Sequence, residues 1–107
     1  MKIREAQDEF GKFLPILMQF IHSSNYTYSL GDARARPEDE RHIKNSNHYS
    51  GLAIDLNLFK NGIWLKNTED HAEFGKFWES LHPNCRWGGR WSDGNHYEFL
   101  TEPRKEE

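Results

Sequence analysis

Two pairs of ionisable side chains stand out because each joins an imidazole to a carboxylate. His48 and Asp55 lie seven positions apart, and Asp93 precedes His96 by three. Histidine nitrogen and carboxylate oxygen are both ligands of Zn²⁺, and a catalytic zinc site has three protein ligands and one open position. We therefore expect a single zinc ion bound by His48, Asp55 and His96.

Asp93 remains outside this ligand set and is the expected general base. Zinc lowers the pKa of a bound water to about 7, and a nearby acid can carry the proton from that water to a leaving amine. Glu98 lies two residues after His96, where it would support the histidine or face solvent. The alternatives without chemistry are a turn-forming Asp93 and structural roles for His48 and Asp55.

Hydrophobic periodicity predicts the elements that position these residues. Residues 4–22 carry apolar side chains at three- and four-residue spacing, which indicates a helix that Pro15 should kink or restart. Residues 26–30 are typical of a short strand, and residues 37–45 of a short helix. In the strand expected over residues 51–59, alternate leucines and Ile54 face the core, so Asp55 points to the opposite face.

The second half of the chain predicts a hairpin, a helix and a closing strand. Asn61-Gly62 is a strong two-residue turn, so residues 63–65 should return antiparallel. A helix is expected over residues 69–82, capped by Asn67 or Thr68, followed by a glycine-rich loop at 87–91 and a strand at 96–100. We expect His22, His42, His71 and His82 on the surface or on helix faces.

These elements predict one α+β domain over residues 1–107, with helices packed on a small antiparallel sheet. Its parts are an N-terminal helix (1–25), a catalytic core (26–100) and a charged tail (101–107). The net charge of −3 excludes the basic footprint of a nucleic-acid-binding protein. Cys85 is the only cysteine, so an internal disulfide is excluded. No membrane insertion is expected, and we expect a monomer.

Two motifs resemble a known family. Ser46-x-His48-x-x-Gly51-x-Ala53-x-Asp55 resembles the first zinc motif of the D-Ala-D-Ala carboxypeptidase and dipeptidase family, which includes phage L-alanyl-D-glutamate endopeptidases. Trp87-Gly88-Gly89-x-Trp91, followed by Asp93-x-x-His96-Tyr97-Glu98, resembles the second motif. The resemblance implies a zinc peptidase with the ligands and base named above, and it places Ser46 near the substrate.

The resemblance also implies an arginine that steadies the substrate after a stretch like Gly31-Asp32-Ala33. An ungapped match places Ala35 at that position, so we expect Arg36, or else Arg34, to take the role. Arg41, Arg86 and Arg90 also lie near the motifs. Arginine binds carboxylates through two parallel hydrogen bonds, and peptidoglycan stem peptides carry several carboxylates.

The expected function is therefore hydrolysis of peptidoglycan stem peptides by a zinc metallopeptidase. We favour an L-alanyl-D-glutamate endopeptidase that acts as a phage endolysin. Because residues 1–5 lack the apolar run of a signal peptide, we expect synthesis in the host cytoplasm and release to the wall through a separate membrane pore. The alternatives are a D-Ala-D-Ala carboxypeptidase or dipeptidase, and a non-catalytic, zinc-containing wall-binding virion module.

Overall fold

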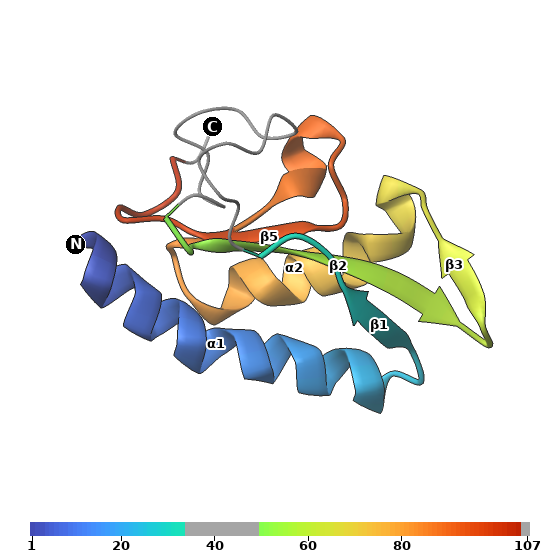
Figure 1. Ribbon diagram of the computed structural model, residues 1–107. Helices are drawn as coiled ribbons and strands as arrows, with labels where there is room; N and C mark the ends of the chain where they lie inside the picture. The colour runs from blue at the N-terminus through green and yellow to red at the C-terminus, as the bar shows by residue number, and fades with distance from the viewer. Residues whose placement is uncertain (34–49, 106–107) are drawn as a thin grey trace.

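The computed structural model describes residues 1–33 and 50–105. In this part of the chain, strands β1 (Thr27–Leu30), β2 (Ala53–Lys60), β5 (His96–Phe99) and β4 (Cys85–Trp87) form an antiparallel sheet in that order. Strand β3 (Ile63–Leu65) pairs with the end of β2. Helices α1 (Ile3–Ser23) and α2 (Ala72–Leu81) pack below the sheet in the view of Figure 1. The expected α+β fold, a small antiparallel sheet with helices packed on it, is confirmed.

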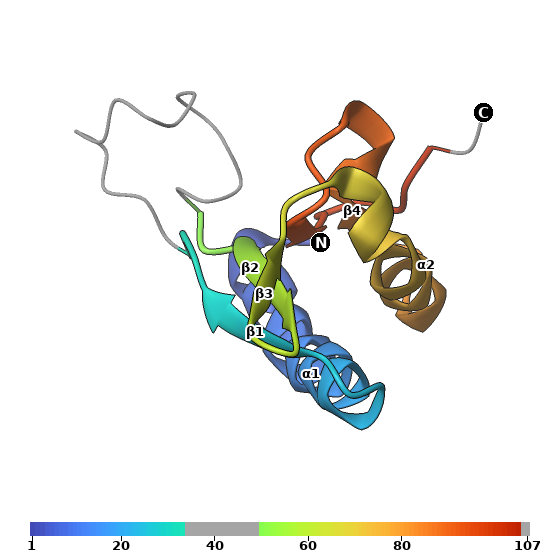
Figure 2. The same ribbon diagram turned by 90° about the vertical axis from the view of Figure 1, so that its right-hand side faces the viewer.

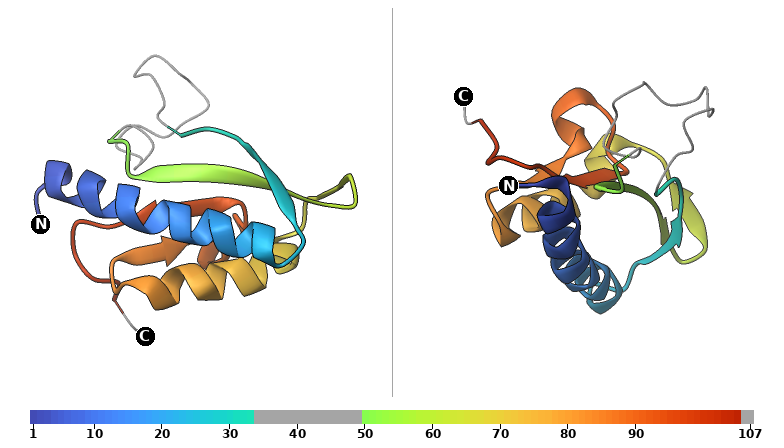
Figure 3. Two further views of the ribbon diagram at one scale, coloured as in Figure 1. Left: turned by 90° about the horizontal axis from the view of Figure 1, so that it is seen from below. Right: turned by 60° about the vertical axis from the view of Figure 1, so that its left-hand side comes forward.

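The hydrophobic core lies between the sheet and the two helices. The left view of Figure 3, seen from below, shows α1 and α2 side by side in front of the sheet. Each large apolar side chain removed from water contributes roughly 1.5–3 kcal/mol, so this layer fixes the central strands in place. The alternation predicted for β2 is confirmed, and the most deeply buried large side chains of the core are Leu17, Ile21, Leu52, Leu56, Leu58, Phe74, Trp78, Tyr97 and Phe99.

The predicted hairpin is also confirmed. Asn61 and Gly62 join β2 to β3 and both have positive φ, +52° and +78°. Two consecutive positive φ values are the signature of the tight turn that asparagine–glycine favours. The short 3₁₀ helix η1 (Thr68–His71) follows and leads into α2, so the predicted helix starts with a tighter turn than expected.

Helix α1 runs through Pro15 without a break, so of the two effects expected at that residue, a kink or a restart, the restart does not occur. Pro15 lies on the exposed side of the helix, while Phe10, Leu17 and Ile21 are buried on the other side. A proline inside a helix costs about 3 kcal/mol. Burial of the three apolar side chains offsets that cost. No described helix has the length and apolar character needed to cross a bilayer.

The segment 85–91 differs from the expected loop. Cys85–Trp87 forms β4 at the edge of the sheet, and Gly88–Trp91 forms a 3₁₀ helix, η2. Figure 2 shows η2 above β4, with α2 below. The two glycines therefore allow a tight helical turn instead of preventing one.

The fold also fixes the charged tail and His71, and one expected element falls outside the described residues. Arg104 is held by the carbonyl oxygens of His82 and Cys85, so the tail is anchored at this residue. His71 is 3% exposed and lies on the buried face of its helix, which is one of the two placements expected for it. The helix expected over residues 37–45 lies outside the described residues.

Candidate functional site

Asp55 and His96 face each other across neighbouring strands. They are register partners in the β2–β5 pair, so their side chains share one face of the sheet. His96 Nδ1 lies 3.4 Å from Asp55 Oδ1. Neighbouring residues of β2 point the other way, into the core. The structure thus brings together two of the three residues expected to bind zinc.

Glu98 holds the opposite side of the His96 ring. His96 Nε2 and Glu98 Oε1 are 2.7 Å apart, and Glu98 Oε2 accepts a hydrogen bond from Arg86 Nε. Glu98 is only 3% exposed, so it is not the solvated strand residue considered as an alternative. A carboxylate hydrogen-bonded to the second nitrogen of a metal-binding histidine typically orients the ring and fixes its tautomer. Nδ1 is then the nitrogen presented to Asp55.

Asp93 lies beside the same nitrogen. Asp93 Oδ2 is 3.9 Å from His96 Nδ1, and the Asp93 side chain is 49% exposed. The backbone fixes this position, because Asp93 N donates to Gly88 O at 2.9 Å and His96 N donates to Asp93 O at 3.1 Å. Asp93 is therefore next to the expected metal ligands and accessible to a substrate.

Gly88 permits this close approach. A Cβ atom at residue 88 would lie 2.2 Å from Asp93 O and 2.7 Å from His96 Cβ. Neither neighbour is the flexible end of a side chain, so any larger residue would push the turn that carries Asp93 away from the strand. The glycine after Trp87 is thus required by the geometry of the site.

The Trp87 ring explains the next glycine in the motif. It lies against Gly75 of α2 and Gly89 of η2, where a Cβ would come within 2.1 Å and 2.2 Å of ring atoms. Its indole Nε1 donates to Gly94 O at 2.7 Å. Trp87 therefore connects α2 to the turn between Asp93 and His96 and holds that turn against the sheet.

The charges around His96 favour a bound cation. Burial alone would lower the pKa of His96, but hydrogen bonds to Asp55 and Glu98 and their negative charges outweigh burial and raise it to about 9. For Glu98, burial would raise the pKa, but His96 and Arg86 together lower it. The carboxylates on either side of the ring thus stabilise a positive charge there, either a proton or a metal ion.

The donor set fits zinc in part. Asp55 oxygen and His96 nitrogen are suitable ligands, and Glu98 provides the outer hydrogen bond that such histidines need. Within residues 1–33 and 50–105, no group of three His, Cys, Asp or Glu side chains could hold a metal ion on its own. His48, the expected third ligand, lies outside the described residues.

The residues expected to bind substrate, Ser46, Arg34 and Arg36, also lie outside the described residues. The stretch before the arginines is described, and it runs alongside Asp55. Gly31 N donates to Asp55 O, and Asp55 N donates to Asp32 O, each at 2.8 Å. The expected family stretch Gly31-Asp32-Ala33 therefore starts next to the site.

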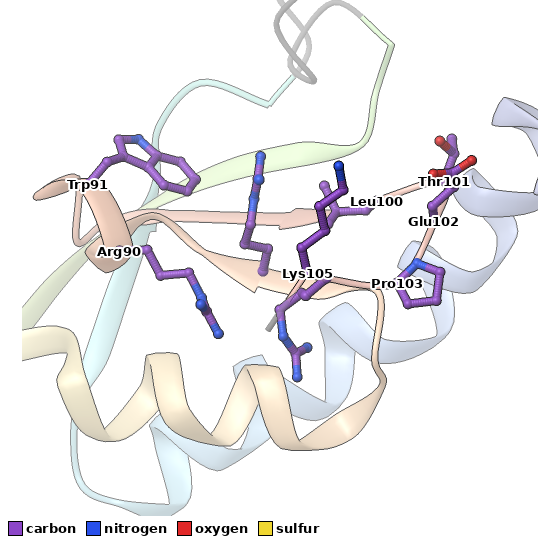
Figure 4. A pocket seen from close by; sticks show the side chains of 9 residues that line it. Arg90, Trp91, Leu100, Thr101, Glu102, Pro103 and Lys105 are labelled. Atoms are coloured by element: carbon purple, nitrogen blue, oxygen red, sulfur yellow. The ribbon is translucent and has the colours of Figure 1, made fainter. Parts of the chain in front are cut away.

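Of the other arginines near the motifs, Arg41 lies outside the described residues, and Arg86 and Arg90 bind carboxylates of this chain. Arg86 pairs with Glu98, and Arg90 donates to Glu79 through Nε and Nη2, each at 2.7 Å. Both line a hollow of about 770 Å³ between η2 and residues 100–105 (Figure 4). Since each pairs with a carboxylate of the protein, their main contribution is to the structure around His96 and η2.

The family comparison adds to this geometry. Residues 39–99 match the family model described as D-alanyl-D-alanine carboxypeptidase. The chain belongs to the D-alanyl-D-alanine carboxypeptidase family. The match supports a peptidase that acts on peptides containing D-alanine, and the matched range includes Asp55, Asp93, His96 and Glu98. The expected closeness to phage endolysins is not supported, and no curated protein matches the chain.

The sequence did not predict two features of this carboxypeptidase-family site. Arg86 lies opposite Glu98 only because β4 pairs with β5, and that strand was not expected. The Trp91 ring packs against the His96 ring, with 5.5 Å between the two centroids. The Arg86 guanidinium carbon lies 4.9 Å from the centre of the same Trp91 ring. The signal available in the sequence was the Trp-Gly-Gly-x-Trp spacing, whose glycines indicate close packing.

Proposed function

We propose that this family member is a zinc-dependent peptidase that cleaves peptidoglycan stem peptides at a bond next to D-alanine. One zinc ion would be held by His48, Asp55 and His96. The observation that carries the proposal is the His96 ring, which has Asp55 at Nδ1, buried Glu98 at Nε2 and Asp93 alongside. Bound zinc supplies a Lewis acid that polarises the substrate carbonyl and acidifies water.

Asp93 carries the proton in this proposal. Hydrolysis breaks the C–N bond, adds the hydroxyl of water to the carbonyl carbon and adds a proton to the leaving nitrogen. Asp93 takes the proton from the attacking water and delivers it to that nitrogen, and its half-exposed carboxylate can reach both. A positioned acid–base group contributes about 10²–10⁴-fold to the rate.

The choice of bond rests on the family match. We favoured an L-alanyl-D-glutamate bond because the short chain and the absence of an apolar run at residues 1–5 are similar to those of phage endolysins, whereas the matched family is described by a D-alanyl-D-alanine activity. Both bonds occur in stem peptides. Mass spectrometry of digested peptidoglycan distinguishes them, because release of free D-alanine supports our proposal and a new D-glutamate amino terminus contradicts it.

Three variants test the assigned roles. We expect Asp93→Ala to bind one equivalent of zinc and lose peptide cleavage, because Asp93 lies outside the ligand set. We expect His96→Ala and His48→Ala to lose both zinc and cleavage. Zinc content by mass spectrometry and product formation by chromatography provide the two measurements.

The opposite outcomes would contradict the proposal. Unchanged cleavage by Asp93→Ala would show that Asp93 does not carry the proton. Full zinc occupancy in His96→Ala would show that the ligand set is wrong. A wild-type protein that binds zinc and cell walls but cleaves neither bond would be the non-catalytic wall-binding module instead.

A further inference from the structure

A small polar pocket of about 220 Å³ lies directly beside Asp93. Its walls come from the turn that holds Asp93, from Asn57 of β2, and from Lys66 after β3 and Thr68 at the start of η1. Gly94 lets these segments approach, since a Cβ at this residue would lie 2.6 Å from Thr68 Cα. Close packing of these segments therefore forms the pocket on the face of the sheet that carries the site.

The position of Asp93 indicates which part of the substrate the pocket receives. In the proposed function, on which this inference rests, Asp93 delivers a proton to the nitrogen of the leaving residue. That nitrogen must then lie within hydrogen-bond reach of the carboxylate, at roughly 2.6–3.2 Å. The leaving residue consequently extends from Asp93 into the adjoining space, which is this pocket.

One acidic and one basic side chain line the pocket. Among the described residues that line it, Lys66 and Asp93 hold the full charges. Burial lowers the pKa of His71, which also lines the pocket, to about 4, against a smaller opposing effect of Asp70. His71 is thus neutral there. The Lys66 ammonium lies 4.6 Å from the centre of the Trp64 ring, which also lines the pocket.

A small amino acid with a free carboxylate matches this arrangement in charge and size. After cleavage it has an ammonium group and a carboxylate, complementary to Asp93 and Lys66. The amides of Asn57 and Asn95, linked at 3.4 Å, add polar groups to the wall. A volume of about 220 Å³ lies below the roughly 300–1,000 Å³ typical of sites for drug-sized ligands.

We propose that this pocket holds the leaving residue of the substrate and that the Lys66 ammonium binds its terminal carboxylate. The enzyme is then an exopeptidase that removes a terminal D-alanine. A peptide bond in the middle of a stem peptide presents no carboxylate to Lys66. The pocket accordingly selects against internal bonds.

Paired synthetic peptides test the role of Lys66. One ends in D-alanyl-D-alanine with a free carboxylate, and the other carries a terminal amide. We expect the wild type to favour the free acid about tenfold in kcat/KM, because a hydrogen bond to a charged group is lost with the amide. Lys66→Gln should remove the preference by raising KM for the acid, while Lys66→Arg should retain most of it.

Lys60 offers a matched control. Its ammonium also lies 4.6 Å from the centre of an aromatic ring, that of Tyr26, but Lys60 does not line the pocket. Lys60→Gln should keep the wild-type preference. Equal cleavage of the two peptides by the wild type, or an unchanged preference in Lys66→Gln, would overturn the assignment.

A binding measurement separates this inference from the proposed function. D-alanine and D-alaninamide can be titrated into the wild type and both glutamine variants by NMR, with no turnover required. Weaker D-alanine binding in Lys66→Gln than in Lys60→Gln supports the pocket even if neither peptide is cleaved, an outcome that would refute only the peptidase proposal. Equal D-alanine binding by both variants would overturn the assignment of this pocket to the leaving residue.

Discussion

Replacement of Glu98 by glutamine tests whether the buried carboxylate prepares His96 for zinc. Glutamine has nearly the same shape and can still accept a hydrogen bond from His96 Nε2, but it removes the negative charge. In the wild type that contact measures 2.7 Å, and Glu98 is 3% exposed, so water cannot replace the lost interaction. The variant therefore isolates the charge behind the ring.

The expected loss is close to the upper end of the known range. Removing the outer hydrogen-bond partner of a metal-binding histidine typically costs 10–100-fold in metal affinity, or about 1.4–2.7 kcal/mol. The burial of Glu98 favours the larger value. Arg86 also loses its partner, but its side chain is 39% exposed and water can solvate it, so we expect little loss of folding stability from that change.

Competition with a zinc chelator measures the affinity, and urea unfolding of the metal-free protein measures stability. Glu79→Gln is the matched control, because Glu79 is a carboxylate with 17% exposure that pairs with Arg90 at 2.7 Å. Its zinc affinity should stay within about threefold of the wild type, a small fraction of the loss expected for Glu98→Gln. If Glu98→Gln bound zinc as tightly as Glu79→Gln, the support attributed to Glu98 would be wrong.

Two other predictions concern packing and pH. Gly88→Ala should lower the free energy of unfolding by about 1–3 kcal/mol, because its Cβ would overlap Asp93 O. Gly11→Ala has open space around its Cβ and should raise the free energy of unfolding by about 0.5–1 kcal/mol. Thermal melts that rank the two variants alike would contradict this prediction. The pKa of His71 is about 4 in the folded protein, against an ordinary value of 6.5. Between pH 6.5 and pH 4 the unfolded chain therefore binds a proton at His71 that the folded protein does not. The free energy of unfolding should fall by up to about 3 kcal/mol over this window. Urea unfolding should show a smaller loss over that window in His71→Gln, and parallel losses in the two proteins would rule out His71 as the cause.

Local patterns in the sequence predicted the strands that carry the site. Alternation in β2 placed Asp55 on the face away from the core, and the Asn61-Gly62 turn fixed the hairpin after it. These features depend on neighbouring residues, which is why they can be read from the sequence. The pairing of β2 with β5, which brings Asp55 opposite His96, joins residues 41 positions apart, and no local pattern encodes it.

The segment around Trp87 shows why the remainder was not predicted. Its glycines indicated a loop because glycine disfavours regular structure. In the folded protein Gly89, together with Gly75 of α2, makes room for the Trp87 ring, and Gly88 makes room for Asp93. A long-range packing partner thus reversed the local preference, and β4 was missed with its Arg86.

The site divides into a part fixed by the sheet and a part fixed by a turn. Arg86, Glu98, His96 and Asp55 lie on one face of three adjacent strands, with positive and negative groups alternating along the series. Paired residues of neighbouring antiparallel strands are about 4.5–5.5 Å apart, so the backbone itself sets this spacing.

Asp93 is different, because its position depends on the approach of Gly88 and on the Trp87 hydrogen bond to Gly94. Changes at Trp87 should therefore reduce turnover more than zinc affinity, whereas changes at Glu98 should reduce zinc affinity first. This division accounts for the tryptophan and the two glycines that precede Asp93. They position the proposed proton carrier, while the strands position the groups that would hold the metal.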